Sequence, residues 1–265
     1  MVYEPEDRDA VQHVSPMHFT QAYAAIYGGD YDGEASQDAH ETLNQTLNRL
    51  KDEERALGNT STMVESVFQG IVFNHFTCKR CGHKSNMTDD FMELGVTMPG
   101  LPSGSAKSRG GHVTLAQCFD TFREQEEFPD RKCRDCSAIG GVSKVSSLGH
   151  VPSHLAVQIR RWQQVVGRRG RVTFQKIDTK VNFPVQEVFD LSPWVSDAAA
   201  ASAGDLNYEL YGVVEHHGSG LNDGHYIAYV KRDDGWWEMD DESTTRVKPG
   251  SVGRANPYLL FYRKG

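Results

Sequence analysis

The sequence GHYIAYV at residues 224–230, followed by WWEMDD at residues 236–241, predicts two neighbouring β-strands. If the chain turns between them, His225 begins one strand near the point where Asp240 ends the other. Facing residues in such a pair have Cβ atoms roughly 5 Å apart, so an imidazole and a carboxylate can meet without a metal. The turn allows more than one register, and either Asp240 or Asp241 can reach the imidazole. The pair is either an ordinary surface contact or two-thirds of a catalytic triad.

Strand patterns continue through the second half of the chain, whereas helical patterns crowd the first half. Residues 36–54 repeat apolar side chains at helical spacing behind a Ser cap, and the capping box at residues 114–117 opens a second, shorter helix. Alternating segments follow at residues 155–159, 172–174, 210–214 and 258–262. This distribution predicts an α+β fold with a mostly antiparallel sheet.

The composition limits the classes of partner. The chain has 265 residues, a net charge of −8 and a pI near 5.8, so we expect no general phosphate-binding surface and no nucleic acid as principal partner. No apolar run approaches the length needed to span a bilayer, and the N-terminus is acidic and lacks the apolar core of a signal peptide. We therefore expect an intracellular protein, cytoplasmic or nuclear or both, with no membrane partner.

The five cysteines suit an intracellular metal site better than a disulfide framework. Cys78 pairs with Cys81, and Cys133 with Cys136, in two Cys-x-x-Cys motifs that together can hold one tetrahedral Zn²⁺ ion. The long segment between the motifs requires two hairpins that meet at their tips. Four thiolates leave no open coordination position, so this zinc ion would be structural. A redox dithiol or four unrelated thiols are the alternatives.

Taken together, these motifs resemble those of ubiquitin-specific proteases in order and approximate spacing. The resemblance extends over nearly the whole chain. The matching segments are Gln37-Asp38-Ala39-His40-Glu41, the two Cys pairs, Leu115-x-x-Cys118-Phe119-x-x-Phe122, Leu155 to Trp162, Lys180-Val181-x-Phe183-Pro184, Gly224-His225-Tyr226, Trp236-Trp237-x-Met239-Asp240-Asp241 and Ala255-x-Pro257-Tyr258-x-Leu260-Phe261-Tyr262.

The resemblance implies a papain-like cysteine peptidase divided into thumb, palm and fingers, with a zinc ribbon at the fingertip. A single domain would then cover residues 1–265, with an N-terminally incomplete thumb at 1–64, fingers at 65–150 and the palm at 151–265. It also implies hydrolysis of the isopeptide bond at the ubiquitin C-terminus, with ubiquitin and ubiquitinated proteins as partners.

The same resemblance assigns roles to individual residues. His225 would be the general base, Asp240 the residue that orients it, and Asp241 an acidic neighbour that assists. The residues expected to contact ubiquitin are Gln37, Asp38, Gly224 and Tyr226. The residues expected to bind zinc are Cys78, Cys81, Cys133 and Cys136.

The nucleophile is the exception. Members of the family carry an Asn-x-x-x-x-x-Cys stretch at the start of a thumb helix, and this sequence contains no such stretch. Cys118 is a poor substitute, because its neighbours Phe119 and Phe122 indicate a buried and inert thiol. We therefore expect the chain to be inactive by itself, and we favour a truncated form of an active enzyme over a natural pseudoenzyme.

Three hypotheses for the function follow. The first is a deubiquitinase whose active form needs a Cys-bearing segment outside this sequence. The second is a catalytically inactive scaffold that still binds ubiquitin. The third is a zinc-ribbon interaction module with no connection to ubiquitin, which would bind zinc but would be indifferent to changes at His225 or Asp240.

Overall fold

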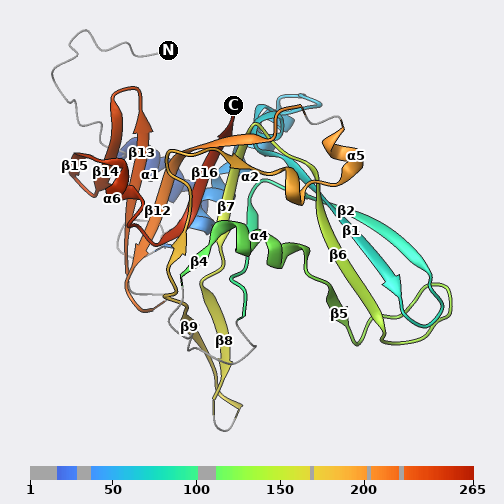
Figure 1. The fold of residues 1–265 in the computed structure, drawn as a ribbon. Helices are drawn as coiled ribbons and strands as arrows, with labels where there is room; N and C mark the ends of the chain where they lie inside the picture. The colour runs from blue at the N-terminus through green and yellow to red at the C-terminus, as the bar shows by residue number, and fades with distance from the viewer. Residues whose placement is uncertain (1–16, 29–36, 101–111, 168–169, 202–203, 221–223) are drawn as a thin grey trace. The chain divides into compact units, whose positions relative to one another are not determined.

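In the computed structural model (Figure 1), the described residues are 17–28, 37–100, 112–167, 170–201, 204–220 and 224–265. The chain divides into two compact units, Met1–Asp38 and Ala39–Gly265. The described part of the first unit contains helix α1 (Met17–Tyr27). Along this helix Phe19, Tyr23 and Tyr27 stack in turn, with ring centroids 5.7 and 4.6 Å apart.

The second unit is built on a large sheet of eight strands. Seven of them follow the order β15-β14-β13-β12-β16-β7-β3, and β11 pairs with β12. Neighbouring strands are antiparallel, except that β3 runs parallel to β7. The α+β fold with a mostly antiparallel sheet is therefore confirmed. The strands are β3 (Leu94–Val96), β7 (His154–Ile159), β11 (Phe189–Asp190), β12 (Asn207–His217), β13 (His225–Arg232), β14 (Gly235–Asp240), β15 (Ser243–Val247) and β16 (Pro257–Lys264).

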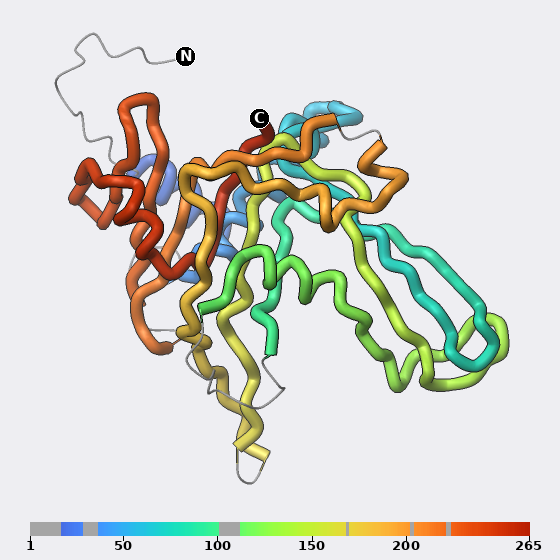
Figure 2. Tube along the Cα trace, viewed as in Figure 1, coloured from blue at the N-terminus to red at the C-terminus, as the bar shows by residue number. Residues whose placement is uncertain are grey.

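A second sheet of four antiparallel strands extends away from the large sheet (Figure 2). Its order is β2-β1-β6-β5, and its strands are β1 (Gly70–Cys78), β2 (Lys84–Phe91), β5 (Glu126–Phe128) and β6 (Val142–His150). Two short pairs complete the strands: β4 (Val113–Thr114) with β10 (Val181–Asn182), and the hairpin of β8 (Trp162–Val166) with β9 (Val172–Lys176). Cys78 ends β1, so the first Cys pair lies at the far tip of this sheet.

The helices of the second unit are α2 (Ala39–Ala56), α3 (Met63–Phe68), α4 (Leu115–Arg123), the 3-10 helix η3 (Ser192–Trp194), α5 (Asp197–Ala200) and α6 (Pro249–Val252). The predicted capping box is present at α4, because the Thr114 hydroxyl accepts from the backbone of Gln117 while the Gln117 side chain accepts from the backbone of Thr114. Ser36, the predicted cap of α2, lies outside the described residues. None of the described helices combines the length and the apolar character needed to cross a membrane.

Helix α4 packs its apolar face into the main core. The Phe119 ring lies 5.4 Å from that of Phe189 and 5.0 Å from that of Trp194, and Phe189 in turn lies 5.5 Å from Tyr262 of β16. This aromatic cluster is part of one apolar core that reaches from the large sheet to the base of β1 and β6. Cys118 is inside this core, with none of its surface exposed.

Candidate functional site

Strands β13 and β14 bring His225 and Asp240 together. Their hairpin closes at the pair Arg232 and Gly235, and the register continues to Ala228 opposite Met239. This tight two-residue connection leaves one register, in which Nε2 of His225 lies 2.5 Å from Oδ1 of Asp240. The two alternatives left open by the sequence are thereby resolved in favour of Asp240 as the direct partner.

The electrostatics of the pair suit a base that holds a proton. The hydrogen bond that the ring donates to Asp240 raises the pKa of His225; partial desolvation opposes this, and the negative charges of Asp241 and Asp240 add to the rise. Because Nε2 is engaged by Asp240, Nδ1 is the ring nitrogen left to take a proton from a reacting group. Both side chains keep 43% of their surface exposed, so a substrate can approach them.

Gly224 lies directly before His225, at a position where there is no room for a larger side chain. A Cβ atom at position 224 would lie 2.6 Å from the carbonyl oxygen of His217 and would also overlap the ring of His216. These two histidines, His216 and His217, pair with Tyr226 and His225 respectively across the β12–β13 ladder. The Tyr226 ring packs 4.9 Å from that of His216, so Gly224 and Tyr226 both border the start of the strand that presents His225.

Lys176 anchors the β8–β9 hairpin to the same corner of the sheet. Its Nζ donates to the carbonyl oxygens of His216 at 2.8 Å and Gly218 at 2.7 Å. Burial lowers the pKa of Lys176. No sequence pattern indicates this role, because a lysine at a strand end is ordinarily a solvated side chain.

Arg161 is a second residue whose role the sequence did not reveal. Only 1% of its surface is exposed, and its guanidinium donates to the carbonyl oxygens of Pro257 at 2.8 Å and Ile177 at 2.9 Å, to that of Thr179 at 3.1 Å, and to Oδ1 of Asn256 at 2.6 Å. Desolvation lowers the pKa of Arg161 to about 10. The planar, five-donor guanidinium thus ties the start of β16 to the segment after β9.

A polar contact joins helix α2 to Glu93, the residue directly before β3. Nε2 of His40 contacts Oε2 of Glu93, whose side chain is only 6% exposed, and Nδ2 of Asn44 lies 2.8 Å from Nε2 of His40 and donates to Oε2 of Glu93 at 3.1 Å. His40 and Asn44 share one helix face because they are four residues apart. That spacing is visible in the sequence, whereas the distant partner Glu93 is not.

The four cysteines of the two Cys-x-x-Cys pairs come together at the tip of the four-stranded sheet. All four sulfur atoms lie within 4.8 Å of one another, with Sγ of Cys78 and Cys136 3.9 Å apart and Sγ of Cys81 and Cys133 3.7 Å apart. These separations exclude disulfides, whose sulfurs lie about 2.05 Å apart. They match the edge of roughly 3.8 Å expected of a tetrahedron with Zn–S distances of about 2.3 Å. The cluster therefore fits one zinc ion.

Tight turns direct these thiols inward. In the first, the backbone N–H of Gly82 donates to the carbonyl of Cys78 at 2.9 Å, and Gly82 has a φ of 72° that favours glycine. In the second, the N–H of Cys133 donates to the carbonyl of Ala138 at 2.8 Å. Backbone N–H groups of Cys81 and Arg80 lower the pKa of Cys78 to about 6, whereas, against a backbone hydrogen bond from His83, desolvation and the neighbouring thiols raise the pKa of Cys81 to about 12. Without a metal, the first thiolate of the cluster therefore forms at Cys78.

The remaining predicted residues are less informative. Burial raises the pKa of Cys118 to about 12, so this thiol is protonated and inert. No hydrogen bond joins a cysteine to His225 in the described part of the chain. Gln37 and Asp38 lie directly before α2, at the end of the first compact unit, and their proposed contact with ubiquitin stays a prediction.

Comparisons with known proteins place these features in a family. The family model described as ubiquitin carboxyl-terminal hydrolase matches residues 1–262. Over 212 residues the chain is 29% identical to ubiquitin carboxyl-terminal hydrolase 3 of Mus musculus, and over 213 residues it is 28% identical to ubiquitin carboxyl-terminal hydrolase nonstop of Drosophila melanogaster. Each match covers 78% of this chain and 40% of the relative, so the chain spans less than half the length of these proteins.

A solved structure shares the fold. It is a SAGA DUB module of Ubp8, Sgf11, Sus1 and Sgf73 bound to monoubiquitin, and the match has a TM-score of 0.77 and 24% identity over 94% of this chain and 53% of that chain. A second, the yeast SAGA DUBm with an Sgf73 mutant, has a TM-score of 0.70 and 25% identity over 86% of this chain and 51% of that chain.

Proposed function

The chain belongs to the ubiquitin carboxyl-terminal hydrolase family, and from this premise we propose that it is the part of a ubiquitin-specific protease that binds ubiquitin and supplies the catalytic base. The reaction is the thiol-dependent hydrolysis of the isopeptide bond at the ubiquitin C-terminus, with ubiquitinated proteins as substrates, inside the cell. The observation that supports this most directly is the 2.5 Å contact between Nε2 of His225 and Oδ1 of Asp240.

The proposed chemistry assigns one task to each residue of the site. A thiol placed at Nδ1 of His225 gives its proton to the imidazole, and the thiolate attacks the carbonyl carbon of the isopeptide bond. The imidazolium then returns the proton to the leaving amine, which leaves the ubiquitin carboxyl group as a thioester on the thiol. A water molecule that gives a proton to the His225 imidazole attacks this thioester, and the proton returns to the departing thiolate, which frees the ubiquitin carboxylate and restores the thiol. Asp240 holds the ring in the tautomer that this cycle needs, and Asp241 adds negative charge that stabilises the imidazolium.

The residues proposed to contact ubiquitin are Gly224 and Tyr226 beside the base, with Gln37 and Asp38 from the resemblance. At the fingertip, Cys78, Cys81, Cys133 and Cys136 would hold one structural zinc ion, which when bound closes the two turns on each other.

We further propose that this chain alone binds ubiquitin without cleaving its conjugates. Four cysteines are gathered at the tip of the four-stranded sheet, and Cys118 is enclosed in the core. Neither location offers a thiolate to Nδ1 of His225. The complete enzyme would therefore need a nucleophile from a segment beyond these residues.

Two measurements on the purified, zinc-loaded chain test the proposal. Calorimetric titration with monoubiquitin should show saturable binding, and a fluorogenic ubiquitin substrate should show no turnover above buffer. The absence of ubiquitin binding would refute the ubiquitin function and leave a zinc-ribbon module. Turnover that is lost in His225→Ala would refute the claim that the chain has no nucleophile of its own.

A further inference from the structure

Strand β2 forms an open edge of the four-stranded sheet. It ends the order β2-β1-β6-β5, and within the described residues no strand pairs with its outer edge (Figure 2). It is eight residues long and pairs with β1 over its whole length without a bulge. The strands at the other edges of the two larger sheets have five residues or fewer. In the described part of these sheets, β2 therefore presents the longest row of backbone N–H and C=O groups without a partner strand.

The edge of β2 lacks the features that usually prevent pairing. Proteins protect edge strands with prolines, bulges or several lysines. The sequence of β2 is KSNMTDDF, with a single lysine at its start and no proline. Residues 86–90 are all exposed, and Met87 keeps 43% of its surface accessible. Asp89 and Asp90 would repel an acidic strand, so a partner must place neutral or basic residues opposite them.

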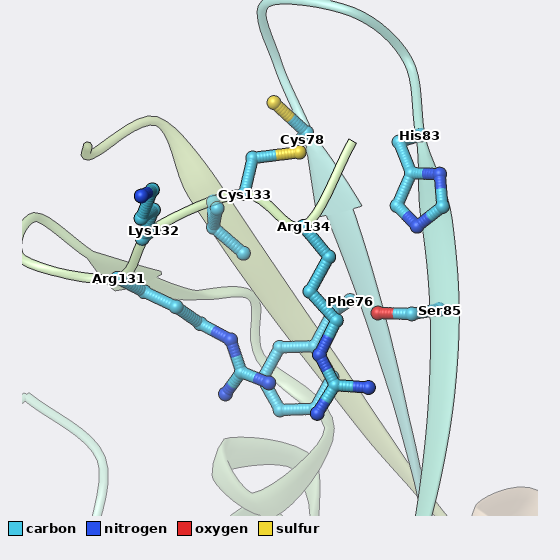
Figure 3. Close-up of a pocket in the computed structure, with 9 residues that line it drawn as sticks. Phe76, Cys78, His83, Ser85, Arg131, Lys132, Cys133 and Arg134 are labelled. Carbon is cyan, nitrogen blue, oxygen red and sulfur yellow. The ribbon is translucent and has the colours of Figure 1, made fainter. Parts of the chain in front are cut away.

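The side chains of β2 alternate between the two faces of the sheet. Ser85 pairs with Phe76 of β1, and Figure 3 shows its hydroxyl pointing toward Phe76. Met87 and Asp89 follow on this face, where Asp89 accepts a hydrogen bond from Asn74 at 2.6 Å. The even-numbered residues of β2, from 84 to 90, therefore share the opposite face.

Lys84 and Asp90 are the charged residues of this opposite face, and both are exposed. Within the described residues, neither of them forms an ion pair. They are six residues apart, which is roughly 20 Å along a strand, so the two charges cannot meet within one chain. In a second copy that runs antiparallel to the first, they can lie opposite each other.

Symmetry restricts the register of such a pair. A two-fold axis perpendicular to the sheet keeps each face of one copy beside the same face of the other, so each residue of β2 lies opposite one an even number of positions away. When the axis passes Met87, Lys84 lies opposite Asp90 of the second copy, and Ser85 lies opposite Asp89. Both aspartates then face a basic or a neutral residue. An axis one residue to either side loses both contacts between Lys84 and Asp90.

We propose that β2 pairs with β2 of a second copy of this chain, antiparallel and centred on Met87, and so joins the four strands of each copy into one continuous sheet. The dimer is weak, because one strand pair is smaller than the interface of ~1,600 Å² in stable complexes and each copy carries a net charge of −8. His225 lies in the large sheet, outside this interface, and the dimer does not rest on the proposed hydrolase function.

The first test uses the zinc-loaded chain at constant ionic strength. Sedimentation equilibrium at concentrations up to about 0.3 mM should show a monomer–dimer equilibrium. Over the same range, hydrogen exchange in residues 84–91 should slow as the concentration rises, whereas exchange in β15, an edge strand of the large sheet, should stay constant. A chain that is monomeric throughout, or a dimer that leaves exchange in β2 unchanged, would overturn the proposal.

Charge reversal then tests the register. Lys84→Asp should weaken dimerisation at least about threefold, because carboxylates then face each other at both ends of the strand pair. Asp90→Lys should weaken it similarly, because ammonium groups then face each other. An equimolar mixture of the two variants should dimerise as tightly as the wild type, because both contacts again join opposite charges. A mixture no tighter than the single variants would overturn the antiparallel register centred on Met87.

Matched controls separate the strand pair from general charge. Lys248→Asp and Asp52→Lys make the same charge changes on exposed residues outside β2 and should change dimerisation less than about twofold. Zinc content verifies the fold of each variant. If Lys84→Asp loses zinc, Lys84→Ser takes its place, and its mixture with Asp90→Lys should still dimerise more tightly than either variant alone. Equal losses in the β2 variants and the controls would overturn the proposal.

Discussion

Nε2 of His225 lies 2.5 Å from Oδ1 of Asp240, across the open end of a hairpin whose other end closes in a two-residue turn. The short turn fixes the strand register, and the register in turn selects Asp240 over Asp241. The relationship predicts that the proton affinity of the imidazole depends mainly on one carboxylate.

Asp240→Asn should lower the pKa of His225, because the amide keeps the size of the carboxylate but removes its charge. An NMR titration of the His225 ring measures this, with Asp241→Asn as the control that should give a smaller decrease. The raised pKa also contributes stability that is complete below the unfolded-state pKa of about 6.5 and is lost as pH rises through the folded-state value. That contribution should disappear in Asp240→Asn. Equal pKa decreases in both variants would show that Asp240 has no special role.

Gly224→Ala should destabilise the fold by about 1–3 kcal/mol, because the new Cβ atom would lie 2.6 Å from the backbone oxygen of His217. Urea unfolding gives the change in free energy. Gly250→Ala is the matched control: a Cβ atom added there would meet no atom within 4 Å, so the change should be neutral or slightly stabilising. A Gly224→Ala protein as stable as the wild type would mean that the β12–β13 corner can relax at no cost.

Arg161→Met should cost about 3 kcal/mol or more, since it leaves buried carbonyl groups of Pro257 and Ile177 without their donor. Arg160→Met, one position earlier on an exposed side chain, should stay within about 0.5 kcal/mol. Thermal and urea unfolding of both variants provide the comparison. If both variants lost a similar free energy of unfolding, burial of the Arg161 guanidinium would not explain its contribution to stability.

Removal of zinc by a chelator should loosen the tip of the four-stranded sheet far more than the large sheet, because the ion closes two distant turns on each other. Hydrogen exchange should accelerate by about tenfold or more in residues 76–86 and 131–143 while β12 and β16 keep their protection. Cys118→Ser should retain the zinc content of the wild type, whereas Cys81→Ser should lose it. A uniform increase in exchange across both sheets would contradict this separation.

The sequence was sufficient wherever a local pattern determined the outcome. The capping box at Thr114, the β13 and β14 strands and the Cys-x-x-Cys pairs each depend on residues close together in the chain, and each is confirmed. The distribution of helical and strand patterns along the chain likewise predicted the α+β fold with its mostly antiparallel sheet, which is confirmed.

Interactions between distant residues were not accessible in the same way. Glu93 contacts His40, and Arg161 contacts Pro257, only after the chain has folded. In the sequence, Glu93 and Arg161 do not differ from ordinary surface residues. The choice between Asp240 and Asp241 also needed the observed turn, because a change of one residue in register exchanges the two faces of a strand.

The last prediction concerns the nucleophile. A ubiquitin with a C-terminal electrophile that reacts with active-site thiols should bind this chain without forming a covalent adduct, because Cys118 is fully buried with a pKa raised to about 12 and the other four cysteines are at the fingertip. Intact-mass spectrometry detects the adduct, and Cys118→Ser is the control for slow labelling of the core thiol. An adduct that persists in Cys118→Ser and disappears in His225→Ala would reveal a zinc-site cysteine that reaches the base. Binding without an adduct, in contrast, would show that none of the five cysteines serves His225, and it would make ubiquitin recognition and bond cleavage separable properties of this fold.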